Sequence, residues 1–151
     1  MKVKLYFFGK TGEISAEEKE LIKRINFRTN FELVALPQAG LSDVAKTKEK
    51  EADLFLSKIS EKSFVVAFDE RGKDLDSVEF SVWVKKQQET FGDLVFVLGG
   101  AHGLHPKVLN RANAKLRFGK MVWTRNLVRH MACEQLYRAF EIQAGSNFHK
   151  E

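Results

Sequence analysis

The sequence has one cysteine, two prolines and no apolar run that approaches the length of a membrane span. With Cys133 alone, an internal disulfide is excluded, and a bilayer-crossing helix needs about 20 consecutive apolar residues. The N-terminal stretch also lacks the basic, apolar and small-residue order of a secretory signal. We therefore expect a soluble, cytoplasmic protein with no membrane partner.

The remaining composition predicts one globular domain with an uneven distribution of charge. Its 151 residues are 44% hydrophobic, enough for a single core, so we expect one domain over residues 1–151. Nine of the 25 basic residues but only three of the 20 acidic residues follow Ala101, which gives this last third a charge of +6. All four histidines lie there too. Such a surface suits a polyanion such as RNA, although a solvated face carries similar charge.

Hydrophobic periodicity predicts strands that alternate with helices. The expected strands cover residues 2–8, 31–36, 63–68, 94–98 and 115–118. The expected helices cover residues 15–27, 42–60, 77–90 and 106–113, and a last long helix capped by Asn126. Within these elements, we expect Val78, Val82 and Trp83 to face inward and Asp69–Lys73 to form a polar loop. The alternation predicts an α/β fold whose mainly parallel sheet is covered by helices on both faces.

A glycine turn follows the fourth expected strand, where open α/β sheets bind their ligands. Its sequence, Gly99-Gly100-Ala101-His102-Gly103, is neither the dinucleotide-binding fingerprint nor a Walker loop. Such a turn alone is more often only a turn. The histidines have no metal-ligand spacing, so we expect no metal site. A second glycine turn lies at Phe118-Gly119-Lys120.

Several motifs in the last third together resemble those of one family. They are Val95-Phe96-Val97-Leu98-Gly99-Gly100, Leu116-Arg117-Phe118-Gly119-Lys120-Met121, Leu127-Val128-Arg129, Glu134-Gln135-Leu136-Tyr137-Arg138-Ala139-Phe140 and the tail Phe148-His149-Lys150-Glu151. In this order and at this spacing they resemble the ribosomal large-subunit methyltransferase H family, which belongs to the SPOUT superfamily.

The resemblance implies a fold, a cofactor and a reaction. Its members thread the C-terminal segment into a trefoil knot, a topology that is otherwise almost absent from proteins. The family implies a homodimer that transfers a methyl group from S-adenosylmethionine to N3 of a pseudouridine in 23S ribosomal RNA of the assembled ribosome.

The resemblance also assigns candidate residues. The cofactor positions it implies are Phe68, Gly100, Gly119, Lys120, Met121, Val122, Trp123 and Thr124. The RNA-binding candidates are Arg125 and Arg129, and the catalytic candidates are His149 and Arg138. Histidine ordinarily titrates near neutrality, so His149 suits a base for the imide proton, although it is equally suited to binding RNA. Arg138 either contacts the substrate or pairs with Glu134 one helical turn earlier.

Two alternatives stay open at the level of sequence. The chain has Thr124 and Arg125 where the family usually has proline and histidine, and Phe148 where it usually has tyrosine. These departures favour a SPOUT enzyme that methylates another RNA. The second alternative is an RNA-binding relative that has lost catalysis, which intact Gly100 and Gly119 without cofactor binding would indicate. The broad apolar surface of the last helix indicates core packing first and a dimer interface second.

Overall fold

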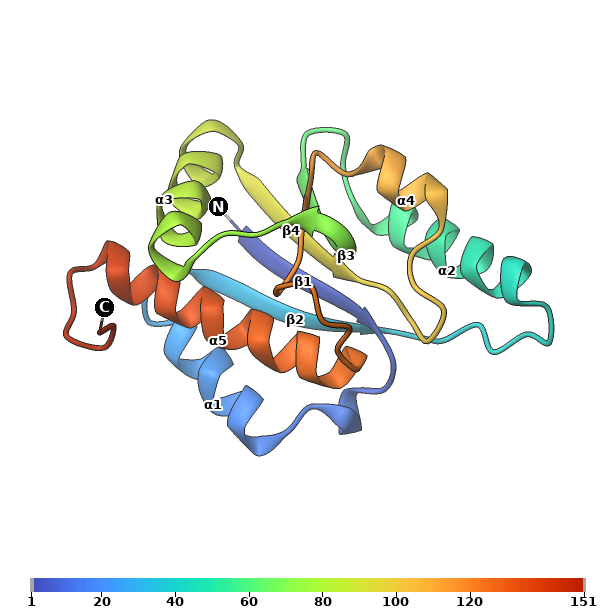
Figure 1. The fold of residues 1–151 in the computed structure, drawn as a ribbon, viewed down its shortest axis with the longest axis horizontal. Coiled ribbons are helices and arrows are strands. Elements are labelled where there is room, and N and C mark those ends of the chain that lie inside the picture. Colours follow the sequence, from blue (N-terminus) through green and yellow to red (C-terminus); the bar gives the residue numbers. More distant parts are fainter. Residues whose placement is uncertain (1, 151) are drawn as a thin grey trace.

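The computed structural model describes residues 2–150, which form a five-stranded sheet with helices on both faces (Figure 1). The strands are β1 (Lys2–Phe8), β2 (Asn30–Leu36), β3 (Phe64–Lys73), β4 (Asp93–Leu98) and β5 (Ala114–Leu116). Their order in the sheet is β2-β1-β4-β3-β5, and every pairing is parallel. The predicted α/β class is confirmed.

Alternating side chains of the strands build a separate core on each face of the sheet. On β1, Val3, Leu5 and Phe7 enter one core, whereas Tyr6 and Phe8 enter the other. The other strands alternate in the same way because successive side chains of a strand point to opposite faces. The nearly continuous apolar sequences of β3 and β4 follow from this burial on both sides.

Three helices cover one face and two cover the other. The first group is α1 (Ala16–Ile25), α3 (Ser77–Thr90) and α5 (Arg125–Gln143), and the second is α2 (Val44–Lys58) and α4 (Pro106–Arg111). Figure 1 shows α5 lying beside both α1 and α3, while α2 and α4 lie together elsewhere. A short 3-10 turn, η1 (Thr11–Glu13), leads into α1.

Two predictions about helix details are wrong. Val82 is 64% exposed, and α3 instead buries Phe80 and Val84, because the inward stripe of the helix is set by its packing on both the sheet and α5. The cap of α5 is Thr124, not Asn126: the Thr124 side chain accepts a hydrogen bond from the backbone N–H of Leu127. Helix α5 therefore begins earlier than its apolar pattern indicates.

The segment Asp69–Lys73, expected to be a loop, belongs to β3. After Phe68 the strand bulges out and returns at Lys73, which pairs with Leu116 of β5. Gly72 permits this return, because a Cβ there would lie 2.6–2.7 Å from backbone atoms of Leu116. The prediction failed because the polar residues of a strand bulge look like loop residues in sequence.

Parallel pairing brings the C-terminal ends of β1, β3 and β4 to one edge of the sheet, where the glycine turns lie. The trefoil knot stays a prediction, since strand order and pairing do not define how the chain is threaded. Among the helices of residues 2–150, none is long and apolar enough to cross a membrane.

Candidate functional site

A cavity of about 700 Å³ lies at the C-terminal ends of β3 and β4. Most of its wall comes from three stretches of chain: the start of the β3 bulge, the glycine turn after β4, and the segment between β5 and α5. Lys48 of α2 and the first turn of α5 complete it. The lining residues used below are Phe68, Asp69, Glu70, Leu98, Gly99, Gly100, Gly103, Phe118, Gly119, Met121, Val122, Trp123, Thr124 and Arg125. This is the edge at which parallel α/β sheets bind ligands.

The structure brings together seven of the eight predicted cofactor residues at this cavity. Phe68, Gly100, Gly119 and the run from Met121 to Thr124 all line it. Lys120 is the exception, because it is exposed and does not line the cavity. Arg125, predicted as an RNA contact, lies at the same wall.

Glycines shape two walls of the cavity. A Cβ at Gly99 would lie 2.6 Å from the backbone carbon of Gly103, so no side chain fits where the turn closes on itself. Gly119 has φ of +78°, in the left-handed region that favours glycine. At Gly100, a Cβ would meet only the carboxylate of Glu51. The glycines therefore keep backbone groups at the cavity wall.

An aromatic stack forms the floor of the cavity beneath these turns. The ring of Phe68 stacks on Phe118 with a centroid distance of 5.2 Å and on Phe96 with a distance of 5.7 Å. Beside this stack, Asp69 and Glu70 supply carboxylates, of which Asp69 pairs with Arg71 at 3.1 Å. The cavity thus combines an apolar aromatic surface with charges of both signs, because four basic residues line it as well: Lys48, Arg71, Arg117 and Arg125.

Helix α5 begins directly beside the cavity and is anchored there by arginines. Arg125 donates a hydrogen bond to the carbonyl oxygen of Phe8 at the end of β1 and lies 3.7 Å from a carboxylate oxygen of Glu13. Thr124 caps the helix, as described above. The two residues that depart from the family pattern therefore fix where α5 starts.

Arg129 does not have the accessible surface that an RNA contact needs. It is 3% exposed, and its guanidinium donates to both carboxylate oxygens of Glu18 at 2.7 and 3.0 Å and to the carbonyl oxygen of Glu13 at 3.0 Å. Its guanidinium carbon also lies 4.7 Å from the centre of the Phe7 ring. We therefore assign Arg129 to the core, as the link between α5 and α1.

The predicted catalytic residues lie together at the C-terminal end of α5. The Arg138 Nη1 atom lies 2.9 Å from Nδ1 of His149. Arg138 also pairs with Glu134, as one of its two expected interactions requires, whereas its contact with substrate stays a prediction. The Phe148 ring lies 4.7 Å from the Arg138 guanidinium and packs edge-on against Tyr137. These contacts hold the tail against its own helix.

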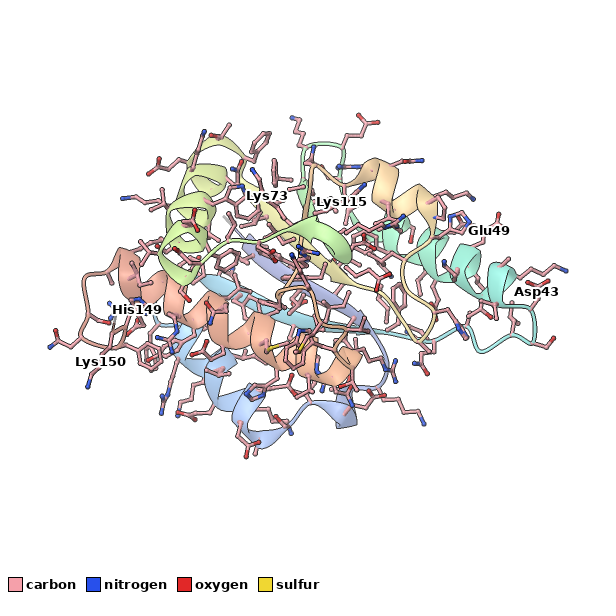
Figure 2. All side chains as sticks on the ribbon, viewed as in Figure 1. Asp43, Glu49, Lys73, Lys115, His149 and Lys150 are labelled. Carbon is pink, nitrogen blue, oxygen red and sulfur yellow. The ribbon has the colours of Figure 1, made fainter. Side chains whose placement is uncertain are left out.

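The catalytic candidates lie far from the cavity within one chain. Arg125 lines the cavity and Arg138 lies 13 positions further along the same helix, which corresponds to roughly 20 Å at 1.5 Å per residue. Figure 2 shows His149 beside the last turns of α5, at the left end of the molecule. The structure therefore divides the predicted site residues into two groups.

Other reactive groups of the chain are poorly suited to chemistry. Within residues 2–150 there is no group of three or more His, Cys, Asp or Glu side chains arranged to hold a metal ion. Burial raises the pKa of the Cys133 thiol to about 12, so it is protonated at neutral pH. The carboxylates of Asp69 and Glu70 were not predicted as site residues, and the signal that could have found them is their position directly after a buried strand.

The buried pair Glu18–Arg129 gives the first prediction. Burial alone would raise the pKa of Glu18, but hydrogen bonds from Arg129 and Ser15 outweigh it and hold the pKa below its ordinary value of 4.5. We expect Arg129→Met to lower the free energy of unfolding by about 3–5 kcal/mol, measured by urea titration at pH 7, because it leaves a buried carboxylate unpaired. The double variant Glu18→Leu/Arg129→Met should recover most of this loss.

The sign of the pH dependence follows from the lowered pKa. The Glu18 carboxylate makes its full contribution to the free energy of unfolding above about pH 4.5, the ordinary pKa of the group. This contribution is lost as the pH falls through the lower pKa that Glu18 has in the folded protein. The wild type should therefore lose more stability between pH 6 and pH 3 than the double variant. If the wild type and the double variant lost equal unfolding free energy over this pH range, the assignment of Glu18 and Arg129 to a stabilising buried pair would be wrong.

Comparisons with known proteins agree with this architecture. The family described as predicted SPOUT methyltransferase matches residues 1–149. A protein from Streptococcus uberis named ribosomal RNA large subunit methyltransferase H is 36% identical over 99% of this chain and all of its own length. A protein of the same name from Desulfotalea psychrophila is 35% identical over the same shares.

The fold also resembles a solved structure. A probable methylase family protein from Haemophilus influenzae superposes with a TM-score of 0.57 at 16% sequence identity, over 99% of this chain and 70% of the other. This likeness concerns the fold alone. From the match over nearly its whole length and from the curated relatives, the chain belongs to the ribosomal RNA large subunit methyltransferase H family of SPOUT methyltransferases.

Proposed function

We propose that this protein uses S-adenosylmethionine to methylate N3 of a pseudouridine in 23S ribosomal RNA of the assembled ribosome, in the cytoplasm. The family supports the reaction class, and its named relatives support a ribosomal RNA of the large subunit as the substrate. The observation that carries the proposal is the convergence of the glycine turns and the aromatic stack on one cavity.

The residues of the cavity fit this cofactor. The stacked Phe68 and Phe118 rings offer an apolar surface to adenine, and the glycine-walled turns offer backbone N–H and C=O groups to its polar edge and to the ribose. The carboxylates Asp69 and Glu70 suit the positive sulfonium and amino groups of the cofactor. The basic side chains of the same lining, such as Lys48 and Arg125, suit its carboxylate. When bound, S-adenosylmethionine supplies a methyl group already activated by the sulfonium.

The protein then has to hold the nucleotide and handle the proton of its imide nitrogen. Arginine only donates hydrogen bonds, so the contact of 2.9 Å requires Nδ1 of His149 to accept from Arg138. A neutral histidine bound in this way carries its proton on Nε2. His149 therefore presents a hydrogen-bond donor to a substrate while the tail is docked, which favours binding of a pyrimidine carbonyl over proton removal.

We also propose that the active enzyme is a homodimer. The cavity and the His149–Arg138 pair lie at opposite ends of α5, so both can serve one substrate only if they come from two chains. Next to the cavity, Met121 is 74% exposed and Val122 is 80% exposed, and Trp123 and Leu127 extend this apolar surface. Exposed apolar surface of this kind is typical of an interface between subunits.

The first test measures cofactor binding. The wild type should bind S-adenosylmethionine in calorimetry with a micromolar Kd, equivalent to about −8 kcal/mol, and transfer methyl to ribosomes that lack the modification. Gly99→Ala should weaken binding at least tenfold, because its Cβ would collide with backbone. Gly92→Ala, at the other end of β4, is the control, because nothing lies within 4 Å of its Cβ.

Three outcomes separate the candidate functions. Binding with transfer to pseudouridine supports the proposal. Binding without transfer to ribosomes supports a SPOUT enzyme for another RNA nucleotide. A wild-type protein that does not bind the cofactor contradicts the proposal and supports the RNA-binding relative.

The role of His149 can be tested by matched substitutions. We expect His149→Ala to lower kcat about 100-fold with unchanged cofactor affinity, because the tail is remote from the cavity of its own chain. His149→Gln should retain much of the activity, since its amide N–H can replace the Nε2 donor. Equal loss in both variants, together with disappearance of the fall in kcat at acidic pH that protonation of a base produces, would instead indicate a general base.

Hybrid dimers test whether two chains share one site. Gly99→Ala is impaired in the cavity and His149→Ala in the tail, so each variant alone should have little activity at a cofactor concentration near the wild-type Kd. After mixing and exchange of subunits, about a quarter of the wild-type activity should return, because half of the dimers contain one site with both parts intact. If cavity and tail of the same chain worked together, mixing would restore nothing.

A further inference from the structure

The cofactor loop, which we define as Phe118–Thr124, has little structure of its own. It lies between β5 and α5, outside any helix or strand, and most of its residues are exposed. Its turn depends on Gly119 at φ of +78°. A segment of this kind keeps one shape only if other parts of the chain hold it.

The first half of the loop is held by one carboxylate. Asp74 accepts hydrogen bonds from Nε and Nη2 of Arg117 at 3.0 and 2.9 Å, in the bidentate arrangement that favours a fixed orientation. The same carboxylate accepts a third hydrogen bond, at 3.2 Å, from the backbone N–H of Gly119. Asp74 is therefore joined directly to the backbone of the turn.

Arg117 is itself fixed from two directions. Its Nη1 donates to the carbonyl oxygen of Glu70 at 3.3 Å, and its backbone N–H donates to the carbonyl oxygen of Lys73 at 3.1 Å. Both partners belong to the β3 bulge, which packs against Leu116 through Gly72. Figure 2 labels Lys73, the residue before Asp74, beside Lys115 of β5.

The second half of the loop is tied to the first. The indole Nε1 of Trp123 donates to the carbonyl oxygen of Phe118 at 2.8 Å, so the two ends of the turn are closed on each other. Phe118 is also stacked on Phe68. The hydrogen bond between Trp123 and Phe118 lies within the loop, so it does not attach the loop to the rest of the protein. If the hydrogen bond from Gly119 to Asp74 were lost, the turn could therefore move as a unit.

Asp74 lies behind the loop and does not line the candidate cofactor cavity. It lines a second cavity, of about 630 Å³, which shares five residues with the first: Phe68, Leu116, Arg117, Phe118 and Gly119. These shared residues form the wall between the two cavities. Any effect of Asp74 on a ligand in the first cavity must pass through this wall.

We propose that Asp74 is a positioning residue of the cofactor site, which fixes the Gly119 turn through its hydrogen bonds to Arg117 and to the Gly119 backbone. This inference rests on the proposed function for its ligand, although not for the effect on the loop. Arg117 holds the pKa of the Asp74 carboxyl below its usual range, so the carboxylate is charged at neutral pH. Because both side chains are partly exposed, the pair contributes little to global stability, and its local effect can be measured separately.

The experiment uses the full chain with Trp83→Phe, which leaves Trp123 in the loop as the single tryptophan. Asp74→Ala and Asp74→Asn are compared with Asp53→Ala, the control. Asp53 is an exposed carboxylate that pairs with Lys107 at 3.2 Å in the contact between α2 and α4. For each protein, the measurements are the Tm, the fluorescence anisotropy of Trp123 and the calorimetric Kd for S-adenosylmethionine.

We expect Asp74→Ala to lower the anisotropy of Trp123 and to weaken cofactor binding at least tenfold, with a Tm within about 2 °C of the parent. In methyl transfer, the KM for the cofactor should rise while kcat at saturation stays within a factor of two. Asp74→Asn keeps an oxygen for the Gly119 N–H and should show an intermediate effect. The Asp53→Ala control should match the parent in every measurement.

The proposal is overturned if Asp74→Ala binds the cofactor within a factor of two of the parent and leaves the anisotropy unchanged. If Asp74→Ala does not fold, Asp74→Asn takes its place in the comparison of cofactor Kd and Trp123 anisotropy with the parent. If the parent itself does not bind S-adenosylmethionine, the proposed function fails. The anisotropy alone then decides whether Asp74 holds the loop.

Discussion

The buried ion pair between Glu18 and Arg129 is the constraint on which the site depends. Glu18 is 1% exposed and Arg129 is 3% exposed, and each would be costly to bury without the other. Because their oxygens and nitrogens must meet within hydrogen-bond distance, α1 and the first turns of α5 can take only one relative position. The capping box between Ser15 and Glu18 fixes the carboxylate in turn, so the constraint extends back to the start of α1.

This constraint explains how an exposed loop can form part of a binding site. The cofactor loop ends at Thr124, directly before the anchored part of α5, and begins directly after β5, which is anchored in the sheet by β3. Both ends are thus attached to rigid elements, and only the residues between them are free to adapt. The apolar side chains of Met121 and Val122 are exposed in this free part, an arrangement that favours contact with a ligand or a second subunit over stability of the single chain.

Local patterns predicted the scaffold better than they predicted the site. The five strands and the face alternation of β1 follow from side-chain period and composition, and the capping box of α1 is visible as Ser15 and Glu18 three positions apart. The partner of Arg129 lies 111 residues earlier in the sequence, so nothing local distinguishes this arginine from an RNA contact. The same holds for Asp74, whose bond to Gly119 spans 45 positions. Pairings of this kind depend on the packed fold, and the sequence indicates only that charged residues are present.

Helix α5 gives the two groups of site residues different surroundings. Its first turn adjoins a cavity with apolar rings and charged side chains of both signs, which suit a cofactor with an aromatic ring and a charged amino-acid part. Its last turns present Arg138 and His149 as hydrogen-bond donors, which suit the carbonyl groups and phosphates of RNA. Separation by the length of a helix keeps the two environments distinct in each chain. Assembly of two chains would then bring them together only across the bound substrates.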